Sequence, residues 1–403
     1  MSSLFGIVLF FLVLMLAIFF HEGGHYLTAR LFGMRVERFF LGFGRTLWSF
    51  RRGETEYGIK AIPLGGFCKI AGMTPYERDG SFLEEDRRRR DAPPPDPTPP
   101  ERQFRNKPAW QRAIVLAAGS ITHFLVAFLL LYVILLASGS PVVDARGVQV
   151  VSTRISGVVA TTSSGQTTPA KAAGLRPGDR IVALDGRQVQ SFDQLHDALA
   201  GKVGRTVQLT YVRDGSQHTV PVTLAYEPKS GRDHGFLGVE GTPLTRRLNP
   251  IAAVGRTAGD FGSLIAGAGK ALAHIPVLLG ARVRTAAPSG GGEGGGGGGG
   301  GGLIGIIGVA RLAGEAVAAN AWVQFVALII EFNVFVGLFN LIPMPPMDGG
   351  YLGFLLYEKV TRRSVDLRKV VPVAMVIVFM LLVLTAGLAW LDITNPVQNP
   401  FGK

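Results

Sequence analysis

Four long apolar runs constrain the fold of this chain more strongly than any other feature of its sequence. Each run is close to the roughly 20 residues that a helix needs to cross the hydrocarbon core of a bilayer. The runs are Leu4–Phe20, Ala113–Ala137, Trp322–Ile342 and Val370–Trp390. Because the 403 residues are 47% hydrophobic and only 17% charged, four membrane spans explain the composition better than one large soluble core.

The first run has the apolar core of a signal peptide but not its flanks. No basic region precedes it, and it continues into His21-Glu22-Gly23-Gly24-His25 where a signal peptide would have a small-residue cleavage site. We therefore expect the run to be retained as a transmembrane helix.

Basic residues are distributed unevenly between the runs. The chain carries 41 Lys and Arg against 29 Asp and Glu, a formal charge of +12. Many of them lie between the first two runs, including Arg87–Arg90, and others fill the short loop between the last two. The positive-inside rule predicts that both loops are cytoplasmic and that the long segment between the second and third runs is outside. No basic stripe interleaved with aromatic residues occurs, so we expect no nucleic-acid partner.

The segment between the second and third runs predicts a separate folded domain at 142–242. Alternating apolar residues at 206–212 and 219–224 are typical of strands. Before them, Ala170–Gly186 predicts a short helix, two glycine-containing turns and a strand closed by Asp-Gly. This succession resembles the core of a bacterial PDZ domain, in which Ser191–Leu199 would be the helix beside the peptide groove.

The remaining segments are linkers or surface pieces by composition. The charged, proline-rich stretch 83–103 is expected to be a disordered loop, and the glycine run ending at Gly302 a flexible tether. The amphipathic stretch 250–283 is expected either on the membrane surface or packed on the PDZ block. We predict that residues 1–141 form the first half of a membrane core, with spans 4–32 and 109–137 and a membrane-associated β-loop at 54–73. The PDZ domain follows at 142–242, and the amphipathic segment and linker at 243–302. Residues 303–403 form the second half of the core, with spans 320–342 and 369–391.

Three ionisable residues at the end of the first apolar run are candidates for chemistry. His21 and His25 are four positions apart, so on a helix both imidazoles project from one face and can hold one zinc ion. Glu22 then lies beside the metal, where a carboxylate can act as general base for an activated water. Ionisable groups inside an apolar span are energetically unfavourable, so where they occur they usually have a function. This argues against a pair of interfacial histidines with a merely structural role.

A hydrolytic zinc site usually needs a third protein ligand, and the candidate is Asp348. It follows a proline-rich break at the end of the third run, where an ordinary Asp-Gly turn is the simpler interpretation. Membrane topology favours the ligand role, because the first and third spans both run from outside to inside. At 1.5 Å per residue, His25 lies roughly 30 Å along its span. Both motifs therefore reach a similar depth, near the cytoplasmic leaflet.

Taken in order, these motifs resemble the site-two proteases, in particular the bacterial branch with PDZ domains. His21–His25 is similar to the family's His-Glu-x-x-His motif, and Asn340–Gly349 to its Asn-x-x-Pro-x-Pro-x-x-Asp-Gly motif. Glu56–Met73 resembles the family's membrane-associated β-loop, which is thought to clamp an unwound substrate as an added strand.

The resemblance implies a zinc-dependent intramembrane endopeptidase with Zn2+ on His21, His25 and Asp348. It also implies Glu22 as general base and Asn340 near the oxyanion or the substrate backbone. The further residues that it implies in substrate binding are Pro343, Pro345, Gly65, Gly66 and Phe67. The implied substrates are single-pass transmembrane proteins, typically an anti-sigma factor that another protease has already cut outside, as in regulated intramembrane proteolysis.

The sequence departs from the family pattern at positions other than the ligands and the base. Gly119–His123 stands where Gly-Pro-x-x-Asn is usual, and His123 is expected to make a polar contact between helices rather than to be a fourth ligand. Gly23 stands where a bulky apolar residue is common, and Tyr351 where a histidine is frequent.

We therefore expect a polytopic α-helical membrane protein with four transmembrane helices, a membrane-associated β-loop and an inserted α+β PDZ domain. It should lie in the cell membrane with the PDZ domain outside, where that domain either takes peptide C-termini in its groove or blocks large ectodomains. Two alternatives stay open. One is a quality-control metalloprotease of another membrane family, for which Glu331 is the candidate third ligand; the other is a PDZ-bearing membrane scaffold with a vestigial site.

Overall fold

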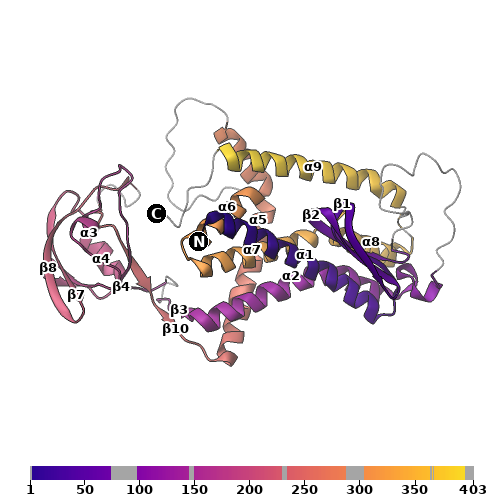
Figure 1. Cartoon of the computed structure of the whole chain (residues 1–403), viewed down its shortest axis with the longest axis horizontal. Helices are drawn as coiled ribbons and strands as arrows, with labels where there is room; N and C mark the ends of the chain where they lie inside the picture. The colour runs from indigo at the N-terminus through magenta and orange to yellow at the C-terminus, as the bar shows by residue number, and fades with distance from the viewer. Residues whose placement is uncertain are drawn as a thin grey trace. The chain divides into compact units, whose positions relative to one another are not determined.

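The computed structural model describes residues 2–73, 98–144, 149–228, 234–286, 304–363, 365 and 367–394. The chain forms two compact units (Figure 1). One runs from the N-terminus to Tyr132 and resumes at Thr257, and the other runs from Val133 to Arg256. Most of the predicted disordered loop and the predicted glycine tether lie outside the described residues.

Four helices in the described residues are long and apolar enough to cross a membrane, which confirms the predicted spans. They are α1 (Ser3–Leu31), α2 (Ala109–Ser138), α7 (Trp322–Asn340) and α9 (Leu367–Thr394). The most apolar window of each has a mean hydropathy between 1.9 and 2.9. Little of this apolar surface is covered by protein: 22% of the window is buried in α1 and α2, and 0% in α9. Such outward-facing apolar side chains match a lipid environment.

A further helix in the first unit, α6 (Ile306–Ala318), packs closely on α1 and was not predicted from the sequence. Two glycines allow the close approach, because a Cβ on Gly6 would lie 2.7 Å from Cα of Gly314. Phe10 is buried in the same contact. Small residues at a helix crossing let two backbones approach, which is a common means of packing helices in lipid.

The amphipathic segment forms one long helix, α5 (Pro250–Ala286). The ring centroid of Phe261 lies 6.3 Å from that of Phe124 and 5.6 Å from that of Phe128, both on α2. The sequence had suggested the membrane surface or the PDZ block as neighbours of this segment, and the contact with a membrane helix is a third arrangement.

Two long antiparallel strands, β1 (Val36–Arg52) and β2 (Thr55–Ile70), form a sheet beside α1 (Figure 1). Both strands are bent, so that Phe39 of β1 faces Cys68 on one side and Tyr57 on the other. The predicted β-loop at 54–73 covers β2, whereas β1 was missed.

The bends convert these two strands into four neighbouring segments. Their order across the sheet is 66–70, 36–41, 56–59 and 46–52. The bends occur at glycines in the left-handed region, with φ of +85° at Gly42 and +101° at Gly65. Residues with a Cβ rarely adopt that conformation, so glycine at these positions permits the bending. The outer edge of 66–70 pairs with no other strand in the described residues.

The second unit contains the inserted α+β domain, and its architecture confirms the predicted PDZ domain. Its sheet has the order β8-β7-β5-β4-β9, with β6 paired to β5. The elements are β4 (Val151–Val158), α3 (Pro169–Ala172), β5 (Arg180–Leu184), β6 (Arg187–Gln188), α4 (Phe192–Leu199), β7 (Thr206–Arg213), β8 (Ser216–Thr223) and β9 (Val239–Pro243). Asp185 and Gly186 have φ of 49° and 79°, as the tight β5–β6 hairpin requires. One apolar cluster, which includes Ile181 and Leu209, forms the core.

Short elements complete the described chain. Two 3-10 turns, η1 (Pro100–Arg102) and η2 (Phe104–Asn106), precede α2. Strands β3 (Ser140–Pro141) and β10 (Thr245–Arg246) pair where the chain enters and leaves the inserted domain. Helix α8 (Asp348–Thr361) follows α7 after a proline-rich bend.

Candidate metal centre

Three predicted site residues from two distant parts of the chain meet at one point. Nε2 of His21 and Nε2 of His25 are 3.3 Å apart on α1. Oδ2 of Asp348, at the start of α8, lies 3.4 Å from Nε2 of His21 and 3.3 Å from Nε2 of His25. These three donor atoms form a nearly equilateral triangle.

The triangle has the dimensions of a zinc site. Donor atoms at about 2.0–2.2 Å from a tetrahedrally coordinated zinc ion lie about 3.4 Å from one another. Oδ2 of Asp348 is buried and has no hydrogen-bond partner in the described residues. A buried carboxylate oxygen without a donor is strongly unfavourable, and a cation at the centre of the triangle would satisfy it. Two imidazoles and one carboxylate are a ligand set that zinc accepts in hydrolytic enzymes.

The ring orientation of His25 is fixed by its surroundings. Its Nδ1 lies 2.7 Å from the backbone carbonyl of Val115 on α2. A carbonyl can only accept, so Nδ1 donates a proton to it, and Nε2 is the nitrogen that faces His21 and Asp348. A metal-binding histidine commonly donates its second nitrogen to a carbonyl or carboxylate in this way.

Glycines allow α1 and α2 to approach closely enough for this contact. A Cβ on Gly24 would lie 2.6 Å from the carbonyl oxygen of Ala118. A Cβ on Gly119 would overlap Nε2 of His25 and lie 2.7 Å from Nε2 of His21. The two histidine rings therefore lie directly against the α2 backbone at Gly119.

The bend between α7 and α8 brings Asp348 to this point. Gly349 and Gly350 pack directly on the backbone of the bend, where a Cβ on Gly349 would overlap Leu341 and a Cβ on Gly350 would lie 2.6 Å from the nitrogen of Pro345. Pro343 is in the same turn, with its Cβ 3.7 Å from the Cβ position of Gly353. The prolines thus pack against the first turn of α8, which carries Asp348.

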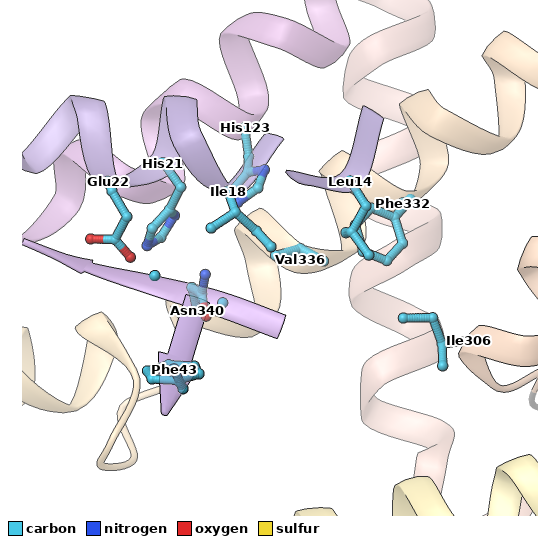
Figure 2. A pocket seen from close by; sticks show the side chains of 12 residues that line it. Leu14, Ile18, His21, Glu22, Phe43, His123, Ile306, Phe332, Val336 and Asn340 are labelled. Carbon is cyan, nitrogen blue, oxygen red and sulfur yellow. The ribbon is translucent and has the colours of Figure 1, made fainter. Parts of the chain in front are cut away.

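A cavity of about 330 Å³ opens beside the histidines. Its lining residues are Leu14, Ile18, His21, Glu22, Phe43, Gly65, Gly66, His123, Ile306, Phe332, Val336 and Asn340. In Figure 2, Glu22 and His21 project from the same helix, with Asn340 across the cavity from them. The lining is apolar apart from these three side chains and His123, as expected for a site that takes an apolar peptide segment.

The predicted substrate-binding residues divide into two groups. Asn340, Gly65 and Gly66 line the cavity, whereas Phe67, Pro343 and Pro345 do not. Gly66 lies against the base candidate, because a Cβ there would be 2.9 Å from Cγ of Glu22.

Phe67 and the prolines have other contacts. The Phe67 ring stacks on Phe40 at a centroid distance of 5.5 Å, and Nζ of Lys60 lies 5.1 Å from its centroid. In the structure these side chains stabilise the sheet and the α8 turn.

Two polar side chains inside the membrane helices lie near the triangle. Nδ1 of His123 on α2 is 2.9 Å from Oδ1 of Asn333 on α7, which is the interhelical polar contact predicted for His123. Asn333 was missed by the sequence reasoning, although an amide inside an apolar span was the signal that could have found it. Glu331, the ligand candidate of the alternative metalloprotease, is exposed on α7 and does not belong to the cluster of His21, His25 and Asp348.

Comparisons with known proteins identify relatives of the whole chain. The sequence model of peptidase family M50 matches residues 9–229 and 301–384. Zinc metalloprotease Rip1 of Mycolicibacterium smegmatis is 34% identical, and the alignment covers 98% of each chain. Metalloprotease MmpA of Caulobacter vibrioides is 31% identical, with 87% of this chain and 86% of that protein covered. Among solved structures, the PDZ domain of an SdrC-like protein from Listeria monocytogenes matches 21% of this chain and 84% of its own, at 22% identity and a TM-score of 0.17.

Proposed function

Because the chain belongs to peptidase family M50 and is a zinc metalloprotease of the site-two protease type, we propose that it cuts peptide bonds inside the transmembrane segments of single-pass proteins. We further propose that His21, His25 and Asp348 hold the zinc ion and that Glu22 is the general base. The observation that carries this assignment is the triangle of donor atoms 3.3–3.4 Å apart, next to Glu22 and open to an apolar cavity.

The chemistry divides between the metal and the side chains around the cavity. Bound zinc supplies the Lewis acidity that activates water and polarises the scissile carbonyl. Glu22 takes the proton from the attacking water and returns it to the leaving amine. Asn340, across the cavity, donates its amide N–H to the substrate carbonyl or backbone and so orients the scissile bond. The apolar lining keeps bulk water away from the reacting groups.

The substrate must lose its helical structure at the site of cleavage. A helix hides its carbonyls in hydrogen bonds to the fourth residue along, and unwinding in lipid exposes backbone groups at several kcal/mol each unless they find partners. The outer edge of 66–70 has no strand partner in the described residues, and Gly66 lies against Glu22. We propose that the substrate adds to this edge as a strand, with its scissile bond next to the base.

Membrane orientation and partners follow from the charge pattern. The basic loops support a metal centre near the cytoplasmic leaflet and a PDZ domain outside. Suitable substrates are single-pass proteins of the anti-sigma-factor kind, trimmed outside by another protease.

In the PDZ domain β9 is an edge strand close to α4, since a Cβ on Gly241 would lie 2.6 Å from the Phe192 ring. We propose that a peptide C-terminus adds along this edge.

The proposal is tested by separating metal binding from catalysis. We expect about one zinc ion per purified chain, a loss of most of it in Asp348→Ala, and no loss in Glu22→Gln, because Glu22 is not a ligand. Co-expressed with tagged single-pass candidates, Glu22→Gln should give no fragments and should retain uncut substrate on purification. Asp197→Ala, on the PDZ domain, is the matched control and should behave as wild type. Full zinc content and activity in Asp348→Ala would remove that residue from the site.

A further inference from the structure

The two histidines of the metal centre are held in different ways. His25 donates from Nδ1 to the Val115 carbonyl at 2.7 Å. Nδ1 of His21 is also buried, but it makes no comparably short hydrogen bond in the described residues, and the polar contact of this ring is with the backbone at Gly119. Metal-binding histidines almost always have a hydrogen bond on the second nitrogen that fixes the ring orientation. Packing contacts with α2 must therefore help to hold the His21 ring.

The surface against which His21 lies is one face of α2. Gly119 leaves room for the ring, because a Cβ there would lie 2.5 Å from Cε1 of His21. One helical turn further along α2, the ring of His123 lies 5.1 Å from the His21 ring, centroid to centroid, at an interplanar angle of 43°. Residues four apart on a helix share a face, so Gly119 provides the space and His123 the flat surface that backs the His21 ring.

The His123 ring is itself fixed by hydrogen bonds from α7. Nδ2 of Asn333 donates to the carbonyl of Ile329 at 2.8 Å, and this leaves Oδ1 as the acceptor for Nδ1–H of His123 at 2.9 Å. Both side chains are buried, with 3% of His123 and 1% of Asn333 exposed. A satisfied polar pair in a low-dielectric interior permits little rotation, so the orientation of the His123 ring is set by α7.

We propose that His123, oriented by Asn333, is a positioning residue that holds the His21 imidazole in its zinc-binding orientation. The inference rests on the proposed ligand role of His21. It makes Asn333, which touches neither His21 nor any other ligand in the described contacts, part of the support of the metal centre. It also gives His123 a role other than that of a fourth ligand, in agreement with its absence from the three-residue ligand cluster.

Zinc affinity in the purified full-length protein tests the proposal. It is measured by competition with a chromophoric chelator. The variants are His123→Ala, His123→Phe and the double variant His123→Phe with Asn333→Leu, and Leu125→Ala on the exposed side of α2 is the control. We expect His123→Ala to bind zinc about 10–100-fold more weakly, the usual effect of losing such a support. The double variant keeps a flat ring and leaves no amide unpaired, so it should recover most of the affinity.

A spectroscopic readout separates positioning from general stability. Cobalt substituted for zinc reports the geometry of the centre through its visible absorption, and we expect that spectrum to change in His123→Ala and to be restored in the double variant. A merely structural role would lower the melting temperature of the metal-free protein but leave the affinity and the cobalt spectrum of the folded fraction unchanged. That result, or wild-type affinity in a folded His123→Ala, would overturn the proposal.

The same measurements distinguish this proposal from the proposed function. If the wild type bound no zinc, or if His21→Ala kept wild-type affinity, the ligand assignment would fail before the role of His123 was reached. If His123→Ala does not fold, the double variant decides: affinity within threefold of wild type supports the backing role, and a loss as large as that expected for alanine contradicts it.

Discussion

At the residue scale, the candidate metal centre depends on glycines, which have no side chain, as well as on the side chains that could bind the metal. Gly119 lies so close to both histidines that any side chain would displace them, and Gly24 lies equally close to the Ala118 carbonyl. Gly23, which is next to Gly24, has nothing within 4 Å of its Cβ position. The glycines of this region are therefore not equivalent, although they look alike in the sequence.

This difference gives a matched pair of substitutions. Gly119→Ala should lower the zinc content of the purified protein by at least tenfold, because the new methyl group would overlap the His25 imidazole nitrogen and displace the ring. Gly23→Ala should keep full zinc content and stabilise α1 by about 0.5–1 kcal/mol, since alanine is the better helix former. Elemental analysis and thermal unfolding of the two variants, prepared in parallel, provide the check. Equal zinc content in both variants would show that the α2 backbone at Gly119 does not lie against the two histidine rings as described.

The sequence contained part of the site in readable form. The spacing of His21 and His25 places two imidazoles on one helix face, and topology alone brings Asp348 to similar depth. The sequence could not predict in the same way that Gly119, His123 and Asn333 lie together beside the two histidines. Their relation depends on which faces of α2 and α7 meet, and local periodicity does not specify how two apolar helices are rotated against each other.

At the element scale, hydrogen-bond direction divides the backbone N–H groups of the sheet beside α1 into two sets. The backbone N–H of Ala71 donates to the carbonyl of Arg35, toward β1. Alternate residues of a strand direct their N–H groups to the same side, so the N–H groups of Lys69 and Phe67 also face β1. Those of Cys68 and Gly66 face the opposite edge, where Glu22 lies against Gly66. In this second set, the Cys68 N–H donates to the Glu22 carboxylate, so this edge holds the proposed base as well as being the edge that a substrate strand would join.

A proline at position 68 should therefore impair cleavage without affecting the metal. Cys68→Pro removes the N–H that donates to the Glu22 carboxylate on this edge, and Cys68→Ser is the matched control that keeps it. We expect cleavage of a tagged transmembrane substrate to fall about tenfold or more in the proline variant, because the loss of about 1.4 kcal/mol of binding in the transition state reduces the rate tenfold. Zinc content should be unchanged in both variants. Lys69→Pro instead removes a bond to β1 and should destabilise the sheet. Normal cleavage by a folded Cys68→Pro would argue against a role of this edge in holding either Glu22 or a substrate strand.

The β1 strand also shows the limit of pattern reading. Its sequence has charged residues and glycines among apolar ones, and its first half is buried or half-buried whereas its second half is exposed throughout. A strand that bends at glycines and pairs with both halves of its partner has no single alternation of inside and outside. The period of two that marked the PDZ strands is therefore missing here, and β1 could be found only from its pairing with β2.

At the scale of the whole molecule, the length and hydropathy of the apolar runs predicted more than local patterns did. The four spans are confirmed because crossing a bilayer requires length and hydropathy, both of which can be read directly. Helices α5 and α6 were predicted incompletely or not at all. They are rich in glycine and alanine, and such helices are recognised by the close contacts they permit, such as Gly6 on Gly314, rather than by hydropathy.

The orientation of the whole chain in the membrane gives the last prediction. Basic loops on one side predict that Thr361, at the exposed end of α8, is cytoplasmic and that Ser216, exposed on β8 of the PDZ domain, is outside. In a Cys68→Ser background, Ser216→Cys should react with an impermeant thiol reagent in intact cells as fully as after lysis, and Thr361→Cys only after lysis. The native thiol contributes little even if retained, because burial raises the pKa of Cys68 above its usual range and so lowers its thiolate fraction. Since α8 begins with Asp348, labelling of Thr361→Cys in intact cells would put the metal centre near the outer leaflet, where the positive-inside argument does not allow it.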